Sequence, residues 1–291
     1  MADPTVVEEW ITASDGAELF TMQWKPARES PVATVVFCHG FGEHVKRYCH
    51  VFDKFARAGI EVYGYDLRGF GQTGEKSKRL GVTGGMAVTC SDITDALRKQ
   101  RREGVPQFLM GHSMGGATVL YYATVGEERS NLAGLVVSAP LIDQPPKIKP
   151  SELKVYACTA LSKVLPSFQM KVAIDEKGIS HDPEAVNKYV ADPLIHGIGS
   201  LGGLADLIWS IRKVQRQTYT EITLPILIVH GNKDPITCFT TAKQLFDKIP
   251  STDKTFREWD GLYHELHNEF EKDRVIEEYV DWILNHTGEK K

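Results

Sequence analysis

A serine occupies the centre of Gly111-His112-Ser113-Met114-Gly115, a pentapeptide that fits the G-x-S-x-G pattern of a nucleophile elbow. An apolar run at residues 106–110 precedes it, and residues 116–123 can continue as a helix. A sharp strand-to-helix turn lifts a serine hydroxyl above the sheet edge, and flanking glycines let backbones pass where a Cβ would clash. The pattern therefore predicts a catalytic nucleophile. Since five-residue patterns also recur by chance, the prediction requires a downstream acid and base, in the order Ser, Asp/Glu, His.

The acid of such a site should follow a buried strand, and two aspartates do so. Asp234 comes after the apolar run at residues 225–230, and Asp143 comes after an expected strand at residues 132–138. We favour Asp234 as the acid that orients the base and keep Asp143 as its competitor. A different role for Asp234 is to cap a helix over residues 237–246.

The base should come last in the chain, and two histidines stand in His264-Glu265-Leu266-His267, after the last expected strand. His264 follows that strand more closely, so we predict that His264 is the general base. The alternative is an ordinary, partly exposed loop histidine. The two histidines are three residues apart and lack the H-E-x-x-H spacing that places two ligands on one helical face, so no metal site is expected here.

A second glycine-containing turn, His39-Gly40-Phe41-Gly42-Glu43, follows the apolar run at residues 33–38. In an acyl-transfer enzyme with this order of residues, such a turn supplies a backbone N–H to the oxyanion of the tetrahedral intermediate. We predict the N–H groups of Phe41 and Met114 as the two oxyanion donors. The alternative is a plain strand-to-helix loop in which His39 is a hydrogen-bonded supporting residue.

A rival function comes from residues 69–74, which fit the G-x-G-x-x-G fingerprint of dinucleotide-binding proteins. That fingerprint should begin at the end of a strand and open a helix. Three residues separate it from the preceding expected strand, and residues 75–79 have the composition of an exposed loop. We therefore expect no nucleotide site and no cofactor.

Composition restricts the class of protein. The 291 residues are 42% hydrophobic and 25% charged with a net charge of −4, which describes a globular chain with a large core. Mild acidity argues against nucleic-acid binding. No apolar run approaches the roughly 18 residues of a membrane-spanning helix, and the first residues are acidic where a signal peptide is basic. With five cysteines and no CxxC spacing, we expect a reducing, cytoplasmic environment.

The order of expected elements predicts an α/β protein. Runs of β-forming residues at 8–11 and 18–24 flank Asp15-Gly16, which predicts a two-residue hairpin turn. Strands and helices then alternate to about residue 140, which indicates a mostly parallel sheet. Residues 141–223 interrupt this alternation with prolines and short apolar segments, and it resumes at residue 224. We predict a core of residues 1–140 and 224–291 with an inserted apolar cap of residues 141–223, which either packs structurally or lines an acyl channel over Ser113.

These motifs stand in the order of the α/β-hydrolases, and together they resemble the monoacylglycerol lipases of that fold, most of all the fungal monoglyceride lipases. The elbow is generic to the fold. The residues that narrow the resemblance are His39 to His44 with Arg47 and Tyr48, together with Tyr63 and the run from Asp66 to Gly69. The resemblance extends from the first hairpin to the last helix.

The resemblance implies an eight-stranded, mostly parallel sheet flanked by helices, a mobile apolar cap, no cofactor, and hydrolysis of the fatty acyl ester of monoacylglycerol. It assigns Ser113, Asp234 and His264 as the catalytic triad and Phe41 and Met114 as oxyanion donors. The insoluble substrate and the apolar insertion also lead us to expect peripheral association with lipid droplets or membranes through the cap. No protein partner is expected.

The glycerol end of the substrate is assigned to Glu43, Arg47 and His267, which the resemblance matches to hydroxyl-binding groups. Glu43 and Arg47 are four residues apart at the start of an expected helix, so one face can hold both. A plain salt bridge is the alternative. At the level of the whole chain, the alternatives are a general carboxylesterase or a lysophospholipase with the same triad, or a non-catalytic scaffold that binds lipid or a partner.

Overall fold

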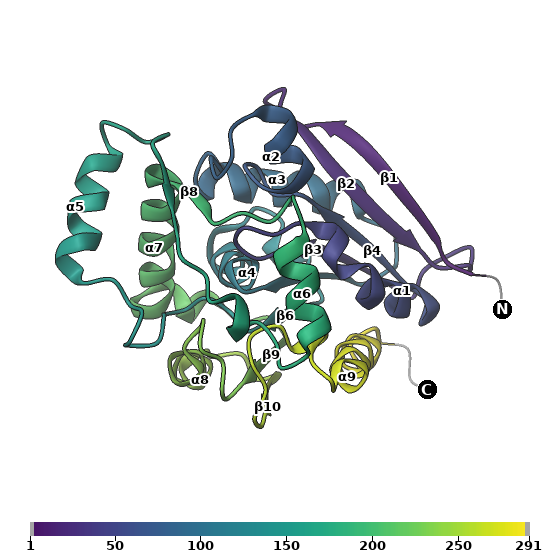
Figure 1. The fold of residues 1–291 in the computed structure, drawn as a ribbon. Coiled ribbons are helices and arrows are strands. Elements are labelled where there is room, and N and C mark those ends of the chain that lie inside the picture. Colours follow the sequence, from purple (N-terminus) through teal and green to yellow (C-terminus); the bar gives the residue numbers. More distant parts are fainter. Residues whose placement is uncertain (1–2, 289–291) are drawn as a thin grey trace.

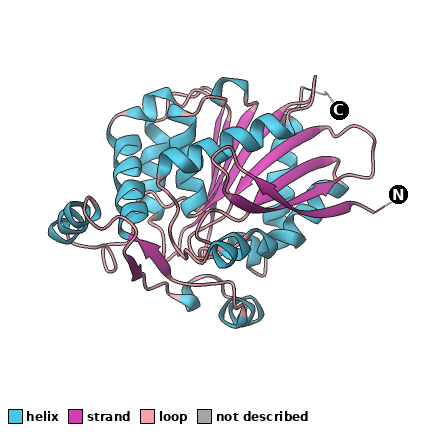
Figure 2. Cartoon of the chain, turned by 90° about the horizontal axis from the view of Figure 1, so that it is seen from above, coloured by secondary structure: helices cyan, strands magenta, loops and turns pink. Residues whose placement is uncertain are grey.

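The computed structural model describes residues 3–288 and contains a central eight-stranded sheet with helices on both sides of it (Figures 1 and 2). The strand order is β1-β2-β4-β3-β5-β6-β9-β10. β2 is antiparallel to β1 and to β4, and the other neighbouring pairs are parallel. The expected eight-stranded, mostly parallel sheet is confirmed. Its strands are β1 (Thr5–Thr12), β2 (Glu18–Lys25), β3 (Ala33–Cys38), β4 (Ile60–Tyr65), β5 (Gln107–His112), β6 (Gly134–Ser138), β9 (Ile226–Gly231) and β10 (Lys254–Trp259).

Burial follows the position of each strand in the sheet. Every residue of β3, β4, β5, β6 and β9 is buried, because helices cover both faces of a parallel sheet, whereas the edge strand β1 is almost wholly exposed. α1 and α9 pack on one face, and α3, α4 and α8 pack on the other. The core helices are α1 (Cys49–Arg57), α2 (Gly71–Ser77), α3 (Met86–Gln100), α4 (Met114–Val125), α8 (Phe239–Lys248) and α9 (Lys272–Asn285).

The main sheet stops at the end of β6 and resumes at β9, so the predicted cap at residues 141–223 adds no strand to it. The inserted segment has its own two-stranded sheet and three helices, of which α5 lies at the outer edge of the molecule (Figure 1). Trp209 of α7 donates to Thr159 of α5 at 2.9 Å and joins these two helices. The elements are α5 (Glu152–Ser162), β7 (Gln169–Lys171), α6 (Pro183–Ala191), β8 (Ile198–Ser200) and α7 (Leu201–Arg216).

Two local expectations were wrong. The connection between β1 and β2 contains five residues, 13–17, because Ala13 and Ala17 close the turn by a hydrogen bond outside Asp15-Gly16. The exposed loop expected at residues 75–79 instead continues the helix α2 as far as Ser77.

The helix α2 forms because Asp66 supplies the acceptor that its N-terminus needs. The Asp66 carboxylate accepts from the N–H of Gln72 at 2.7 Å, and a Cβ on Gly71 would lie 2.2 Å from the same carboxylate. A nucleotide pyrophosphate would require this N-terminus for itself. Gly71 therefore has a structural explanation in the close approach of Asp66. Gly69 and Gly74 are explained by close backbone, because a Cβ on them would lie 2.5 Å from the nitrogen of Val82 and 2.6 Å from the carbonyl carbon of Gly69, respectively.

Candidate active site

The nucleophile elbow joins β5 to α4, and Ser113 takes a backbone conformation with φ 55° and ψ −117°. A positive φ is unfavourable for a residue with a Cβ, so the surrounding structure must enforce it. The flanking glycines make this possible, because a Cβ on Gly115 would lie 2.1 Å from the Cys38 carbonyl oxygen and a Cβ on Gly111 would lie 2.4 Å from the Gly115 carbonyl oxygen. The turn thus brings the serine to the carboxyl end of the central strands.

The three residues predicted as a triad lie in hydrogen-bond contact. Oγ of Ser113 lies 2.9 Å from Nε2 of His264, and Nδ1 of His264 lies 2.7 Å from Oδ2 of Asp234. The serine hydroxyl can donate to Nε2, while the protonated Nδ1 donates to the carboxylate. The competing acid, Asp143, pairs with Lys149 instead. The contacts of His264 are thus compatible with Asp234 as the acid, and this role stays a prediction.

Both oxygens of the Asp234 carboxylate accept hydrogen bonds. Oδ1 accepts from the N–H groups of Ile236 and Thr237 at 2.7 and 2.9 Å, and Oδ2 also accepts from the Thr237 hydroxyl at 2.7 Å. Burial opposes the charge, but His264 and these donors outweigh it and lower the pKa of Asp234 to about 2. Asp234 therefore stays ionised at neutral pH and also ties down the turn that leads into α8.

Two effects shift the pKa of the His264 imidazole in opposite directions. Burial favours its neutral form, but the neighbouring Asp234 carboxylate outweighs burial, so the pKa of His264 lies above its ordinary value of 6.5. A base of this kind accepts a proton more readily than a free histidine does. The pair of residues is therefore suited to remove the proton of Ser113.

The turn after β3 lies beside the elbow. A Cβ on Gly40 would lie 3.2 Å from Cβ of Ser113, so the backbone that carries the Phe41 N–H runs directly past the serine. Met114 is the first residue of α4, and its N–H belongs to the first helical turn, which has no acceptor within the helix. The geometry is compatible with these two amides as oxyanion donors, and the role stays a prediction.

His39 supports this turn through two hydrogen bonds to the backbone. Its Nε2 accepts from the N–H of Leu67 at 2.9 Å, so Nδ1 carries the proton and donates to the Gly40 carbonyl at 2.8 Å. Burial lowers the pKa of His39 to about 4, which keeps the ring neutral. The residue acts as the hydrogen-bonded support that the alternative interpretation of the turn proposed, and this is compatible with an oxyanion donor at Phe41.

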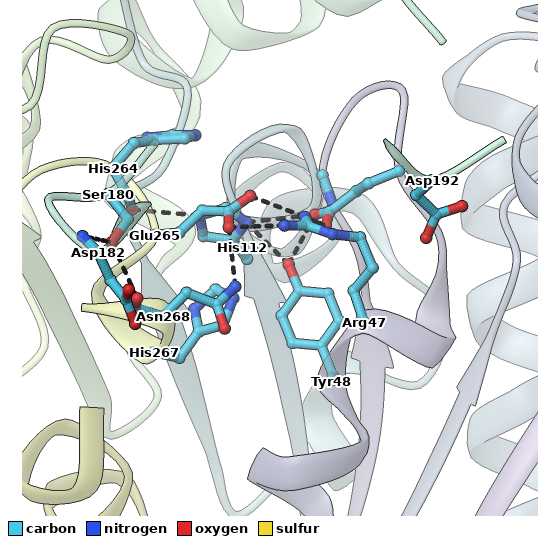
Figure 3. A network of polar contacts seen from close by, with 12 residues as sticks. Arg47, Tyr48, His112, Ser180, Asp182, Asp192, His264, Glu265, His267 and Asn268 are labelled. Carbon is cyan, nitrogen blue, oxygen red and sulfur yellow. Dashed lines mark hydrogen bonds and ion pairs between the residues drawn. The ribbon is translucent and has the colours of Figure 1, made fainter. Parts of the chain in front are cut away.

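Two of the residues predicted to bind glycerol, Glu43 and Arg47, lie in a buried polar network. The third, His267, stacks its buried ring on Tyr48 of that network, with centroids 4.7 Å apart, and Nε2 of the ring has no hydrogen-bond partner within the described residues (Figure 3). Glu43 contacts Arg47, and its Oε1 accepts from the Tyr48 hydroxyl at 2.6 Å. Arg47 is also paired with Glu265, and the side chains of Glu43 and Arg47 are 3% and 9% exposed. The ring of His267 is buried, and burial and the nearby His112 hold its pKa well below the ordinary value. Their contact with a substrate stays a prediction.

The supporting roles of three residues were not predicted from the sequence. Thr237 and Tyr48 carry hydroxyls that bond to Asp234 and Glu43, and Glu265 pairs with Arg47 across 218 residues of chain. For Glu265 the only available signal was its place next to the expected base. The charge partner could not be inferred, because sequence spacing carries no information about a contact over that separation.

The inserted segment closes over this site. The N–H of Glu265 donates to Ile179 at 2.7 Å and the N–H of His196 donates to Gly42 at 3.0 Å, so the insertion is tied to the loops of His264 and Phe41. A narrow, partly open cavity remains beside the elbow. It is lined by Phe41, Leu67, Phe70, Gly81, Thr83, Met86, Thr89, Met114, Thr118, Gly199, Gly203, Leu204 and Leu207.

Comparison with known proteins agrees with this geometry. Residues 29–271 match the sequence model of the Hydrolase_4 family, described as serine aminopeptidase, S33. The chain is 37% identical over 282 residues to a putative monoglyceride lipase of Schizosaccharomyces pombe, covering 93% of this chain and 72% of the relative. The chain belongs to the monoglyceride lipase family of α/β-hydrolases. It is accordingly an enzyme, a serine hydrolase.

Other relatives place the chain in the same family. The monoglyceride lipase of Rattus norvegicus is 32% identical over 279 residues, covering 94% of this chain and 89% of the rat protein. A soluble variant of the Saccharomyces cerevisiae monoglyceride lipase, solved with a substrate analog, superimposes with a TM-score of 0.88. That structure is 26% identical and covers 99% of this chain and 97% of its own. The resemblance to fungal monoglyceride lipases is thus confirmed.

Proposed function

We propose that this chain hydrolyses the single fatty acyl ester of monoacylglycerol and releases glycerol and a free fatty acid. The observation that carries the proposal is the contact series from Ser113 through His264 to Asp234, at 2.9 and 2.7 Å, in a member of the monoglyceride lipase family. This series supports acyl transfer through a serine ester.

The reaction proceeds in two halves. His264 takes the proton of Ser113 as Oγ attacks the ester carbonyl, and Asp234 stabilises the resulting imidazolium. The tetrahedral intermediate collapses, the carbon–oxygen bond to glycerol breaks, and His264 gives its proton to the departing glycerol oxygen. Water then attacks the acyl-enzyme with His264 as base, and the fatty acid leaves as Ser113 regains its proton.

The oxyanion of both intermediates would accept from the N–H groups of Phe41 and Met114. Loss of one such donor typically costs about 2.7–4 kcal/mol of transition-state stabilisation. Because both donors are backbone groups, what matters is their position and not the identity of their side chains. The carboxylate of Glu43, which accepts from the Gly40 N–H at 2.6 Å, supports the position of the Phe41 peptide.

Glu43, Arg47 and His267 are proposed to bind the glycerol hydroxyls. For that contact, glycerol must replace part of the buried network in which these residues lie. A site that pairs hydroxyls penalises substrates without them. Glu43→Ala and Arg47→Ala should therefore lower kcat/KM for monoacylglycerol more than for a p-nitrophenyl ester of the same acyl chain. Equal losses on the two substrates would contradict glycerol binding.

The competing functions can be separated by two measurements. Covalent labelling by a fluorophosphonate probe tests the serine, and a folded wild-type protein that resists the probe would leave only the non-catalytic scaffold. Turnover on monoacyl-, diacyl- and triacylglycerols, lysophospholipids and simple esters then tests the substrate. Faster hydrolysis of lysophospholipid or of simple esters than of monoacylglycerol would favour the lysophospholipase or the general carboxylesterase.

We also propose that the enzyme docks on lipid droplets or membranes through α5. Within residues 3–288 no helix has the length and apolarity needed to cross a bilayer. The helix α5, however, exposes an apolar stripe at helical spacing, and only its Val155 is buried. The stripe consists of Leu153, Tyr156, Ala157, Ala160 and Leu161 and continues at Val164 in the turn just after the helix.

Liposome flotation tests the docking. Leu161→Asp and Val164→Asp place charges at positions that are 47% and 76% exposed, so they should weaken binding without unfolding the chain. Val125→Asp is a matched control, because Val125 is 39% exposed at the end of α4 and lies outside the inserted segment. Flotation that is equal in all three variants and the wild type would contradict docking through α5.

A further inference from the structure

Arg47 lies between two carboxylates that belong to the two loops carrying the reacting groups (Figure 3). Its Nη1 and Nη2 each lie 2.7 Å from one oxygen of Glu265, and Nη1 also contacts Glu43. A guanidinium that meets a carboxylate through two parallel hydrogen bonds fixes both the distance and the orientation of its partner. The pair therefore fixes the loop of Glu265 relative to the helix start that carries Arg47.

Each carboxylate is connected through the backbone to a neighbouring residue that we assign to the reaction. Glu265 is the next residue after His264, and its second oxygen also accepts from Nδ2 of Asn268 at 2.8 Å. Glu43 accepts from the Gly40 N–H at 2.6 Å, one peptide before Phe41. A displacement of Arg47 would thus also displace His264, through Glu265, and the N–H of Phe41, through Glu43.

Solvent cannot compete for these ion pairs. The side chains of Arg47 and Glu265 are 9% and 3% exposed. The ring of Tyr189, from the inserted helix α6, covers the guanidinium at 4.8 Å from its centroid. Charged hydrogen bonds are stronger in such a low-dielectric setting than at the surface. The arrangement is therefore a rigid spacer, unlike an exposed salt bridge, which would hold its partners only loosely.

We propose that Glu265 is a positioning residue for the base His264, and that its bidentate pair with Arg47 fixes the distance between that base and the oxyanion turn. The proposal rests on the serine hydrolase mechanism above, and it adds a residue to which no role in the reaction has been assigned. Displacement of a reacting group by about 1 Å can cost about a hundredfold in rate. The role should therefore be visible in kcat.

Glu265→Gln is the variant that tests the pairing. It keeps the shape and leaves Arg47 paired with Glu43, so it buries no isolated charge. We expect kcat to fall about tenfold to a hundredfold, with KM within about twofold, on both monoacylglycerol and a p-nitrophenyl ester of the same acyl chain. Fluorophosphonate labelling should slow by the same factor. Glu184→Gln is the matched control, because Glu184 lies on α6 with 74% of its side chain exposed.

Arg47→Lys supplies a second arm, because a lysine keeps the charge but cannot form the bidentate pair. On the p-nitrophenyl ester, which carries no glycerol, it should show the same separation of kcat from KM, and the double variant should lose less on that ester than the two single losses multiplied together. Multiplicative losses would overturn the coupling between the two residues. A folded Glu265→Gln protein with kcat within about twofold of wild type would overturn the positioning role.

The outcomes also separate this proposal from the substrate assignment. A loss confined to KM, or to monoacylglycerol alone, would overturn positioning and would make Glu265 part of the glycerol site. If the wild type hydrolysed the p-nitrophenyl ester but not monoacylglycerol, the proposed substrate would be wrong. The comparison of Glu265→Gln with wild type on the simple ester and the probe would still decide the positioning role.

Discussion

Ser113 combines a reactive hydroxyl with a backbone conformation that its own Cβ disfavours. Its φ of 55° and ψ of −117° hold the hydroxyl beside His264, at a cost on the order of 1–3 kcal/mol that the surrounding turn must offset. Glycine adopts positive φ without this penalty. The residue is thus placed for reaction at some expense of stability.

Replacement of Ser113 should therefore separate activity from stability. Ser113→Ala and Ser113→Gly should each lower kcat on the order of 10⁶-fold, because no other nucleophile replaces the hydroxyl. Thermal unfolding followed by circular dichroism should give a higher Tm for the glycine variant than for the alanine variant, because only the latter keeps the strained Cβ. An alanine variant as stable as the glycine variant would show that the elbow is not strained.

The pH dependence of hydrolysis should report on His264. Only its neutral form can accept the serine proton, so kcat/KM should fall as the pH drops through a pKa above 6.5. Burial lowers the pKa of His264, and the carboxylate of Asp234 raises it by more. Asp234→Asn removes the carboxylate that raises this pKa but leaves the imidazole buried. The acidic limb of the pH–rate profile should therefore move to lower pH, while kcat falls about 10⁴-fold. A pH–rate profile of both proteins measures this, and an unmoved limb would contradict the assignment of Asp234.

The same pair contributes to stability in a defined pH window. The pKa of Asp234 is lowered to about 2, so its contribution is present above its ordinary value of 3.8 and is lost as the pH falls through about 2. The pKa of His264 is raised, so its contribution is present below 6.5 and is lost as the pH rises through the raised value. Asp234→Asn should therefore destabilise the fold most at mildly acidic pH.

At the scale of elements, local sequence patterns were sufficient to predict those strands and turns that depend only on residues close together in the chain. The apolar runs predicted β3, β5 and β9, and the glycines at residues 111 and 115 predicted a tight elbow. The extension of α2 to Ser77 was not predictable, because it depends on the carboxylate of Asp66 reaching the helix start. The pairing of Arg47 with Glu265 is likewise a product of tertiary structure.

The helix α7 should have to move before a long acyl chain can bind. Gly203, Leu204 and Leu207 of α7 form one wall of the narrow cavity beside the elbow. A long acyl chain placed in this cavity would run against that wall, so we expect the wall to open. The inserted segment is then expected to be mobile relative to the core during turnover.

A cross-link between α7 and the core tests this motion. A Cβ on Gly203 would lie 2.8 Å from Oγ1 of Thr83, so Thr83→Cys with Gly203→Cys places two thiols close together. The oxidised double variant should lose at least about tenfold in kcat/KM on a long-chain ester but much less on an acetyl ester, and reduction should restore it. The two single variants are controls. Full activity of the cross-linked protein on long chains would show that α7 does not open.

At the scale of the whole molecule, charge is distributed unevenly. The chain carries a net charge of −4, yet residues 147–171 contain five lysines and one glutamate, a local charge of +4. Lys154 and Lys163 fall on opposite edges of the apolar stripe of α5, because successive helical residues turn by 100°. An apolar face with lysines on both sides is typical of helices that lie on an anionic lipid surface.

Lysine substitutions should therefore change lipid binding without changing the chemistry. Lys154→Glu with Lys163→Glu reverses four units of charge beside the stripe, which at about 1 kcal/mol per basic residue near an anionic surface should weaken binding by at least about tenfold. Flotation with liposomes containing phosphatidylserine measures this, and added salt should reduce the difference, because screening acts on exposed charges. Turnover of a soluble p-nitrophenyl ester should stay unchanged, since α5 lies at the outer edge of the molecule, away from α4, which Ser113 precedes (Figure 1). Equal flotation of variant and wild type at low salt would leave the apolar stripe as the whole of the docking surface.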